Sequence, residues 1–527
     1  MTGDHQNASP QVNQDLTRRT LATVVVALIA LAWAIYRPDK SRPFHMTDFS
    51  EFVSLLESQD GVIGRIRAVV DYYATQGRFN VIPYAWIAFK WTLMGWWSPG
   101  WQVLRAVLML TLFGLSFLLL RRLGASRLGG LIGASVFLFA PSASDGWVHL
   151  TMAEPLGAAI TLAMSLLATR YQASARWQRD ALLMAVGAAA LILTKELLAP
   201  LMFLPIVLAL TLQPDGMFAW PVRNRRNVVL VLSVAVASLL AIVPVAWLYL
   251  RGGESAYASM YGRATQSIGG IFANWIAALI PFEAAAFPAS VPWALSVFAF
   301  FGLVATGWRI AFHSGGDARR ARWLLSIAFL VPLVGILAYI PNPWYARFYS
   351  LPLLTGTALL IGMGASYVHR VAPHGAALAT LAWAVMTVFP AGSAWGFGSS
   401  RDAEQRRNDR LVSFVADSID ADSVHFAVTR PPPYAWLGLG ATMNRFAAAT
   451  GRPWPLTRDI GCDQARAELE SRPALVIVNL VSSCELQAPE RRVVSEAYKR
   501  VDWPRLRIVS DSSHADIFPP TPNHRSP

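Results

Sequence analysis

Residues 102–141 read QVLRAVLMLTLFGLSFLLLRRLGASRLGGLIGASVFLFAP, and this stretch decides the class of fold. It contains two apolar runs, 102–120 and 128–141, and its only charged residues besides Arg105 are the arginines of the turn between them. Runs of about 20 apolar residues can cross a bilayer as helices, which satisfy their own backbone polar groups. The stretch therefore predicts two membrane spans joined by a basic turn.

Further apolar runs flank this pair on both sides, which predicts about eleven transmembrane helices in all. They lie near 20–36, 152–168, 181–194, 197–212, 228–250, 291–308, 323–340, 349–365 and 375–391. The first run has no small-residue cleavage site at its end, so we interpret it as an uncleaved anchor rather than a removed signal peptide.

Charge is distributed unevenly along the 527 residues. Only 15% of the residues are charged, against about 25% in soluble globular proteins. The first 400 residues hold 28 basic and 16 acidic residues, whereas residues 401–527 hold 17 and 16. A polytopic α-helical membrane protein with a soluble tail explains this distribution, and a series of soluble domains does not.

Basic residues of the membrane part concentrate in alternate loops. The basic residues of the outer loops after the first are only Lys195, Arg251, Arg263 and Arg347. The net charge of +13 therefore follows the positive-inside rule and indicates topology rather than a nucleic-acid partner. The expected inner loops contain Arg121, Arg122, Arg127, Arg170, Arg176, Arg179, Arg223, Arg225, Arg226, Arg309, Arg319, Arg320, Arg322 and Arg370.

This alternation predicts a bacterial inner-membrane protein with three regions. Residues 1–19 form a cytoplasmic N-terminus, residues 20–391 the transmembrane domain, and residues 392–527 a small extracytoplasmic α/β domain. In the tail we expect both strands and helices. The expected strands are 425–429, 474–480 and 507–510, and the expected helices are 441–450 and 464–471.

The tail location can be tested with a topology reporter. A phosphatase fused after residue 400 should be active in the periplasm, because an odd number of spans follows the cytoplasmic N-terminus. Activity of a cytoplasm-only reporter at the same point would show that the span count is wrong.

The only two cysteines, Cys462 and Cys484, both lie in this tail. Disulfides persist outside the cytoplasm, so we expect them to pair and to stabilise the tail by about 3 kcal/mol in the chain-entropy model. Two free thiols are the alternative, because a spacing in sequence says nothing about geometry.

The outer segment 37–101 is too polar to span the membrane. Apolar residues recur in it at helical spacing, which is typical of helices that lie in the membrane interface. A tryptophan group before the second span fits an aromatic belt. Its members are Trp91, Trp96, Trp97 and Trp101.

Ionisable residues at the outer ends of the spans are the functional candidates, because such groups are costly at membrane depth. Asp48 and Glu51 follow the first span and are three residues apart. Glu154, Arg105 and Arg347 lie at the outer ends of later spans, and Lys195-Glu196 forms an outer turn.

In this layout the chain resembles the GT-C superfamily of polyprenyl-phosphate-dependent glycosyltransferases, including its lipid A aminoarabinose transferase and protein O-mannosyltransferase groups. Matching features are an acidic residue after the first span, a short motif like 77–84 with Arg78, and an Arg at the start of the second span. A second acidic residue at Glu154-Pro155, a Lys in the next outer turn and the late motif Arg347-Phe348-Tyr349 complete the pattern.

The resemblance covers roughly residues 15–365 and implies sugar transfer from a polyprenyl-phosphate donor to an envelope glycan, lipid or protein, with inversion. Asp48 is then the expected base, with Glu51 as its rival because the family's adjacent acidic pair is split here. Glu154 is the second acidic site residue. Arg347, with Lys195, Arg105 or Arg78, is expected to bind the donor phosphate.

Structural explanations compete for each candidate. Asp48 could cap a helix, and Glu154 could complement a helix dipole in the first turn. Lys195 with Glu196 could be a solvated turn pair, and Arg347 could snorkel to the interface.

The competing functions are a transporter or lipid flippase, and a non-catalytic subunit of an envelope-polysaccharide system. No metal signature is readable in the sequence, and a divalent ion held by Asp48 and Glu154 is the alternative.

Overall fold

The computed structural model describes residues 55–75, 79–95, 97–148, 153–213, 224–251, 347–371 and 377–385, five strands between 426 and 508, and scattered single positions. The chain divides into two compact units. One comprises residues 1–42 and 60–399, and the other comprises residues 43–59 and 400–527.

Two helices of the outer segment, α3 (Gly61–Thr75) and α4 (Val81–Met94), pack against each other. The rings of Tyr73 and Tyr84 stack between them with centroids 4.6 Å apart. Val69 is buried while Ile63 on the same helix is largely exposed, as expected for an amphipathic helix.

The quoted stretch forms α5 (Ser98–Arg122) and α6 (Arg127–Phe139), followed by the short helix α7 (Pro141–Val148). Helix α6 begins at Ser126, whose hydroxyl accepts a hydrogen bond from the backbone N–H of Gly129. Such an N-cap satisfies a backbone donor that the first helical turn leaves unpaired. The basic turn therefore begins a new helix, as the sequence predicts.

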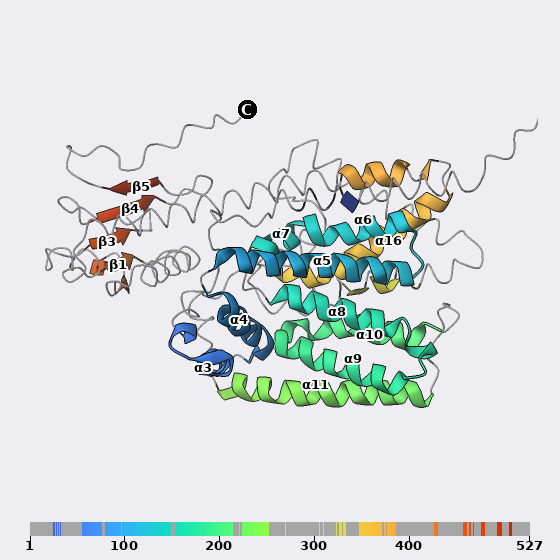
Figure 1. Cartoon of the computed structure of the whole chain (residues 1–527), viewed down its shortest axis with the longest axis horizontal. Helices are drawn as coiled ribbons and strands as arrows, with labels where there is room; N and C mark the ends of the chain where they lie inside the picture. Colours follow the sequence, from blue (N-terminus) through green and yellow to red (C-terminus); the bar gives the residue numbers. More distant parts are fainter. Residues whose placement is uncertain are drawn as a thin grey trace, which may run out of the picture. The chain divides into compact units, whose positions relative to one another are not determined.

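The next helices are α8 (Glu154–Ala168), α9 (Trp177–Thr194), α10 (Phe203–Thr211) and α11 (Arg225–Arg251), with the 3-10 turns η1 (Tyr171–Ala173) and η2 (Glu196–Met202) between them. Helices α8 and α9 form an antiparallel hairpin that α11 extends (Figure 1). Late in the membrane part, the 3-10 turn η3 (Arg347–Leu353) leads into α16 (Leu354–Val371).

Small residues allow α6 and α16 to approach closely. A Cβ atom at Gly129 or Gly133 would collide with α16, where Ala358, Gly362 and Ser366 recur every fourth residue. Glycine and serine ridges of this spacing let membrane helices pack backbone to backbone, where lipid supplies no hydrophobic driving force. The backbone N–H of Ser126 also donates to the Ser366 hydroxyl at 3.0 Å.

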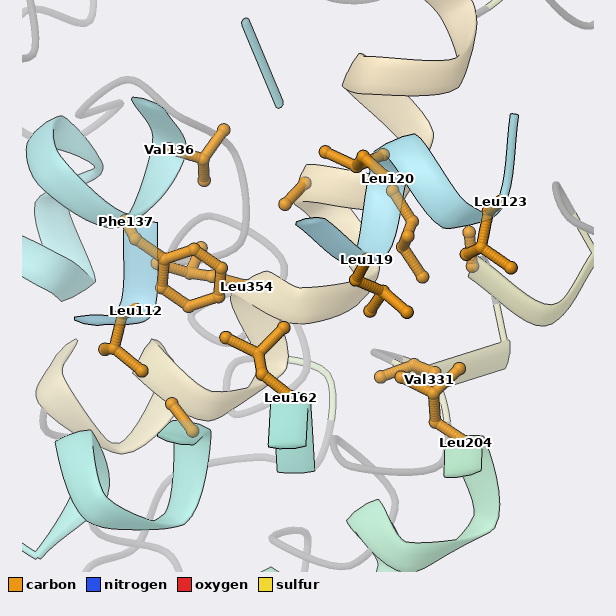
Figure 2. Packing of buried hydrophobic residues seen from close by; sticks show 14 of the residues in the cluster. Leu112, Leu119, Leu120, Leu123, Val136, Phe137, Leu162, Leu204, Val331 and Leu354 are labelled. Atoms are coloured by element: carbon orange, nitrogen blue, oxygen red, sulfur yellow. The ribbon is translucent and has the colours of Figure 1, made fainter. Parts of the chain in front are cut away.

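The core of this unit includes apolar side chains from α5, α6, α8, α9, α10 and α16. Leu112, Leu120, Phe137 and Leu162 are buried and point into the same interior (Figure 2). Inside a membrane such residues stabilise the bundle by close packing rather than by leaving water.

Three described helices are long and apolar enough to cross a membrane: Pro99–Arg122, Arg225–Leu248 and Ser350–His369. Shorter apolar helices cover Arg127–Phe139, Glu154–Ala168 and Glu196–Thr211. The expected spans from 102 to 250 and at 349–365 therefore all coincide with helices, some shorter than predicted. The spans at 20–36, 291–308 and 323–340 lie largely outside the described residues, so the total of eleven stays a prediction.

The tail unit contains one sheet of five strands in the order β2-β1-β3-β4-β5. Its strands are β1 (Phe426–Thr429), β2 (Thr457–Ile460), β3 (Val476–Asn479), β4 (Val493–Ala497) and β5 (Arg505–Ile508). All pairs are parallel except β4 with β5.

The three expected tail strands overlap β1, β3 and β5, whereas β2 and β4 were not expected. Thr457-Arg458-Asp459-Ile460 and β4, in which Ser495 and Glu496 interrupt the apolar residues, lack the apolar run on which the prediction relied. The expected helix at 441–450 and most of that at 464–471 lie outside the described residues. The α/β class of the tail therefore stays a prediction.

Candidate functional site

Glu154 is the first residue of α8 and is followed by Pro155, which suits the first turn of a helix. The residue is 1% exposed, so the chain buries an acidic side chain at this helix end. Its Oε1 accepts a hydrogen bond from Lys195, while its Oε2 is buried without a hydrogen-bond partner among the described residues. A buried carboxylate oxygen without a partner is costly and calls for a functional or ligand-based explanation.

Lys195 separates α9 from η2 and has an extended backbone, with φ −168° and ψ 126°. This single non-helical residue turns its side chain toward α8, where Nζ lies 2.7 Å from Glu154 Oε1. The Lys195 side chain is 16% exposed and that of Glu154 is 2% exposed. The pair is therefore nearly buried, which excludes the solvated turn pair considered as an alternative for Lys195.

Gly157 brings the two elements close enough for this pair to form. It lies one turn after Glu154 on α8, and a Cβ atom there would overlap the side chain of Leu198 on η2. The backbone N–H of Leu198 in turn donates to the carbonyl of Lys195 at 2.8 Å. The close approach of η2 to α8 therefore helps to hold Lys195 against the carboxylate.

Arg105 lies in the second turn of α5, and its guanidinium donates to the backbone carbonyl of Trp147 at 3.0 Å. Trp147 belongs to α7, is 1% exposed and donates its ring N–H to the Phe137 carbonyl at 2.7 Å. Two hydrogen bonds thus connect α5, α6 and α7 at the end of the bundle where α8 begins. The sequence predicted Arg105 but gave no indication of Trp147.

Arg347 is the first residue of η3, and η3 packs against α7 and against α8. The turn therefore lies beside the helix that begins at Glu154. Ser350, three residues further on, is fully buried, and its hydroxyl has no hydrogen-bond partner among the described residues. Ser350 is a second buried polar group in this region and was not singled out from the sequence.

The structure thus brings elements carrying Glu154, Lys195, Arg105 and Arg347 to one end of the bundle, although they are far apart in sequence. The other candidates, Asp48, Glu51, Arg78, Cys462 and Cys484, lie outside the described residues. Within the described residues no group of three or more His, Cys, Asp or Glu side chains gathers as a metal site would.

Helix α4 carries a buried lysine that was not among the candidate residues predicted from the sequence. Lys90 is 5% exposed, and its ammonium lies 4.6 Å from the centre of the Trp101 ring and 5.5 Å from that of Trp86. Burial lowers the pKa of Lys90 from 10.5 to about 7, while the aromatic faces favour its charged form. Trp101 is therefore a buried partner of this lysine, and so not the exposed belt residue expected from the sequence, whereas Trp97 is 60% exposed.

Replacing Lys90 by methionine should raise the stability of the protein most at low pH. Between about pH 7 and 10.5 the unfolded chain binds more protons at this position than the folded chain, so wild-type stability rises with pH. Melting temperatures in detergent should therefore be a few degrees higher for Lys90→Met at pH 6, and this gap should narrow by pH 10. A gap that stayed constant with pH would show that Lys90 titrates normally.

The apolar helices and the charged groups at their ends define the chain as a helical membrane protein. No protein-family model matches the chain, and no curated protein sequence is significantly similar.

Solved structures of two GT-C glycosyltransferases overlap the fold in part. ArnT from Cupriavidus metallidurans in the apo state is 13% identical with a TM-score of 0.46, over 87% of this chain and 93% of its own. The arabinofuranosyltransferase AftD from Mycobacteria is 16% identical with a TM-score of 0.44, over 79% of this chain. The chain spans 31% of AftD's length. Both TM-scores are below 0.5.

Proposed function

We propose that this protein is a GT-C-type glycosyltransferase of the bacterial inner membrane. It transfers a sugar from a polyprenyl-phosphate donor to a glycan, lipid or protein acceptor on the extracytoplasmic face. The observation that carries the proposal is the nearly buried ion pair of Glu154 and Lys195, whose second carboxylate oxygen has no hydrogen-bond partner among the described residues. It lies at the end of the bundle where α7 and η3 also meet.

The charges at this end suit a lipid-phosphate donor. The leaving phosphate needs cations at the depth of the membrane interface, and arginine binds phosphate oxygens in a bidentate manner while lysine acts as a point charge. Arg347, Lys195 and Arg105 are the proposed phosphate ligands, with Arg78 as a further candidate. A low-dielectric site strengthens each of these interactions.

In the proposed reaction a carboxylate removes the proton from an acceptor hydroxyl. The acceptor oxygen forms a bond to the anomeric carbon while the bond from that carbon to the phosphate oxygen breaks, and the electron pair leaves with the polyprenyl phosphate. Direct displacement of this kind inverts the anomeric centre. We assign the base to Asp48, with Glu51 as the alternative, and give Glu154 the role of holding Lys195.

The distribution of charge within the described helices disfavours a transporter or flippase. Helices α5, α6, α8, α9, α11 and α16 have ionisable residues near their ends and none in their middle turns, and α10 has none at all. A transport path through the membrane would need such groups near the midplane.

Mass analysis of envelope glycans and glycolipids tests the proposal. A deletion strain should lack one sugar substituent, wild-type protein should restore it, and Glu154→Gln should not. Leu182→Val, on the exposed side of α9 and away from the site, provides a matched control that should restore it. Restoration by Glu154→Gln at wild-type protein level would contradict a catalytic role for this site.

A further inference from the structure

The α8–α9 hairpin carries a second polar cluster at the end opposite Glu154 and Lys195. Helix α8 has 15 residues, so the two ends are about 22 Å apart. We call the second group the basic cluster. It consists of Arg170, Arg176, Arg179, Arg225 and Arg226, from the end of α8 and the starts of α9 and α11.

Hydrogen bonds hold the three elements of the basic cluster together. The Tyr171 hydroxyl donates to the carbonyl of Arg226 at 2.6 Å, and the Arg226 guanidinium donates to the carbonyl of Gln172 at 2.7 Å. The amide of Gln172 donates to the Asn227 side chain at 2.8 Å. The guanidinium of Arg226 also lies 5.7 Å from the centre of the Trp177 ring. These contacts fix the positions of the elements that carry the arginines, and a ligand site requires such a fixed frame.

Among the described residues only one carboxylate belongs to this frame, and it lies beneath the arginines. Asp180 is fully buried, and its Oδ1 lies 3.0 Å from Arg170 and 3.7 Å from Arg179. The side chains of those arginines remain 51% and 52% exposed, and Arg176 and Arg225 are exposed as well. One negative charge shared among five arginines leaves the cluster strongly positive.

The positions of these cations oppose the stability of their own helices. Arg176 is the N-cap of α9, and Arg225 and Arg226 are the first residues of α11, which has no acidic residue in its first turn. Cations at a helix N-terminus are unfavourable, because that end already carries a partial positive charge. Arginines elsewhere in these loops would orient the protein in the membrane equally well. A bound anion would relieve the repulsion at both helix starts.

Exposed apolar side chains follow the arginines along α9 and α11. Leu182 and Leu183 follow Arg179 by three and four residues and are 61% and 43% exposed. Leu232 lies two turns into α11 and is 59% exposed. A ligand with an anionic head and apolar chains satisfies both parts of this surface. We infer that the basic cluster binds the headgroup of an anionic phospholipid, with its acyl chains along α9 and α11.

The spread of the cluster over two helix starts favours a headgroup with two phosphates. One phosphate would lie by Arg176 and Arg179 and the other by Arg225 and Arg226. Cardiolipin should therefore bind more tightly than phosphatidylglycerol, and phosphatidylethanolamine should bind least. This inference does not depend on the proposed reaction, because it concerns the other end of the hairpin.

Lipid titration of the delipidated full-length protein, followed by native mass spectrometry, tests the inference. Arg176→Gln with Arg179→Gln should weaken cardiolipin binding about tenfold or more, given the contribution of each charge near an anionic headgroup. The double variant Arg176→Lys with Arg179→Lys should retain most of the affinity and shows that the frame still folds. Arg122→Gln with Arg127→Gln removes the same charge from the exposed turn between α5 and α6 and should leave binding unchanged.

Three results would overturn the inference. Wild-type protein could bind cardiolipin no better than phosphatidylethanolamine. The two glutamine pairs could weaken binding equally, which would reflect general surface charge. Inorganic phosphate at millimolar concentration could displace cardiolipin fully, which would indicate a site for a free anion rather than a lipid.

Discussion

Glu154→Gln is expected to lower sugar transfer at least 100-fold and to destabilise the protein by about 3–5 kcal/mol. The substitution removes the charge that faces Lys195 and leaves the ammonium without its carboxylate at a nearly buried position. Breaking one partner of a buried ion pair costs more than the pair itself contributes, because the remaining charge stays desolvated. Unfolding in denaturant and transfer in proteoliposomes measure the two effects separately.

A double variant separates the structural role of the pair from its functional role. Glu154→Gln with Lys195→Met removes both charges, so stability should return close to the wild-type level. Transfer should remain low, because no cation at this position can then bind the donor phosphate. Recovery of both stability and transfer in the double variant would show that the pair only supports the fold. Lys195→Met alone should raise the Michaelis constant for the donor more than Glu154→Gln does.

The helical class of the membrane part followed from the sequence, because long apolar runs in a chain with few charges have one solution in lipid. The observed bounds of α5 and α11 differ from the predicted spans by only a few residues. The packing of the helices against one another could not be predicted from the sequence. The match between Gly129 and Gly133 on α6 and the small residues of α16 joins segments more than 200 residues apart. Hydropathy cannot show such a pairing.

The sequence points to single candidate residues but not to the contacts between them. Glu154 and Lys195 were both candidates, yet they were assigned separate roles. Their contact depends on one extended residue between α9 and η2 and on the space that Gly157 leaves for Leu198. Neither condition has a signal in a single sequence. Trp101 shows the same limit, because a buried tryptophan beside Lys90 and a belt tryptophan look identical in sequence.

Ion pairs connect the two helices of the α8–α9 hairpin at both of its ends. Lys195 with Glu154 joins the helices at one end, and Arg170 with Asp180 joins them at the other. The two cations differ in exposure, since the Lys195 side chain is 16% exposed and that of Arg170 is 51% exposed. Both carboxylates are buried, and Glu154 Oε2 and Asp180 Oδ2 each lack a hydrogen-bond partner among the described residues. The less exposed Lys195 is the better placed of the two cations for strong contacts with a phosphate, because charges interact more strongly at low dielectric.

Asp48→Asn is expected to reduce transfer about 10²–10⁴-fold, the usual loss when a general base is removed. Asparagine keeps the shape and most hydrogen bonds of the side chain, so donor binding should survive. Arg347→Ala should show the opposite pattern and weaken donor binding as well as turnover, because it is a proposed phosphate ligand. Donor affinity and single-turnover rates, measured on the same membranes, distinguish the two cases.

Glu51→Gln is the matched control for Asp48→Asn, because the two carboxylates are three residues apart and share one segment. If Asp48 is the base, Glu51→Gln should keep transfer within a fewfold of wild type. Full activity of Asp48→Asn together with loss in Glu51→Gln would move the base to Glu51. If both variants and Glu154→Gln were fully active, none of the three candidate carboxylates would act as base, and the glycosyltransferase proposal itself would be wrong.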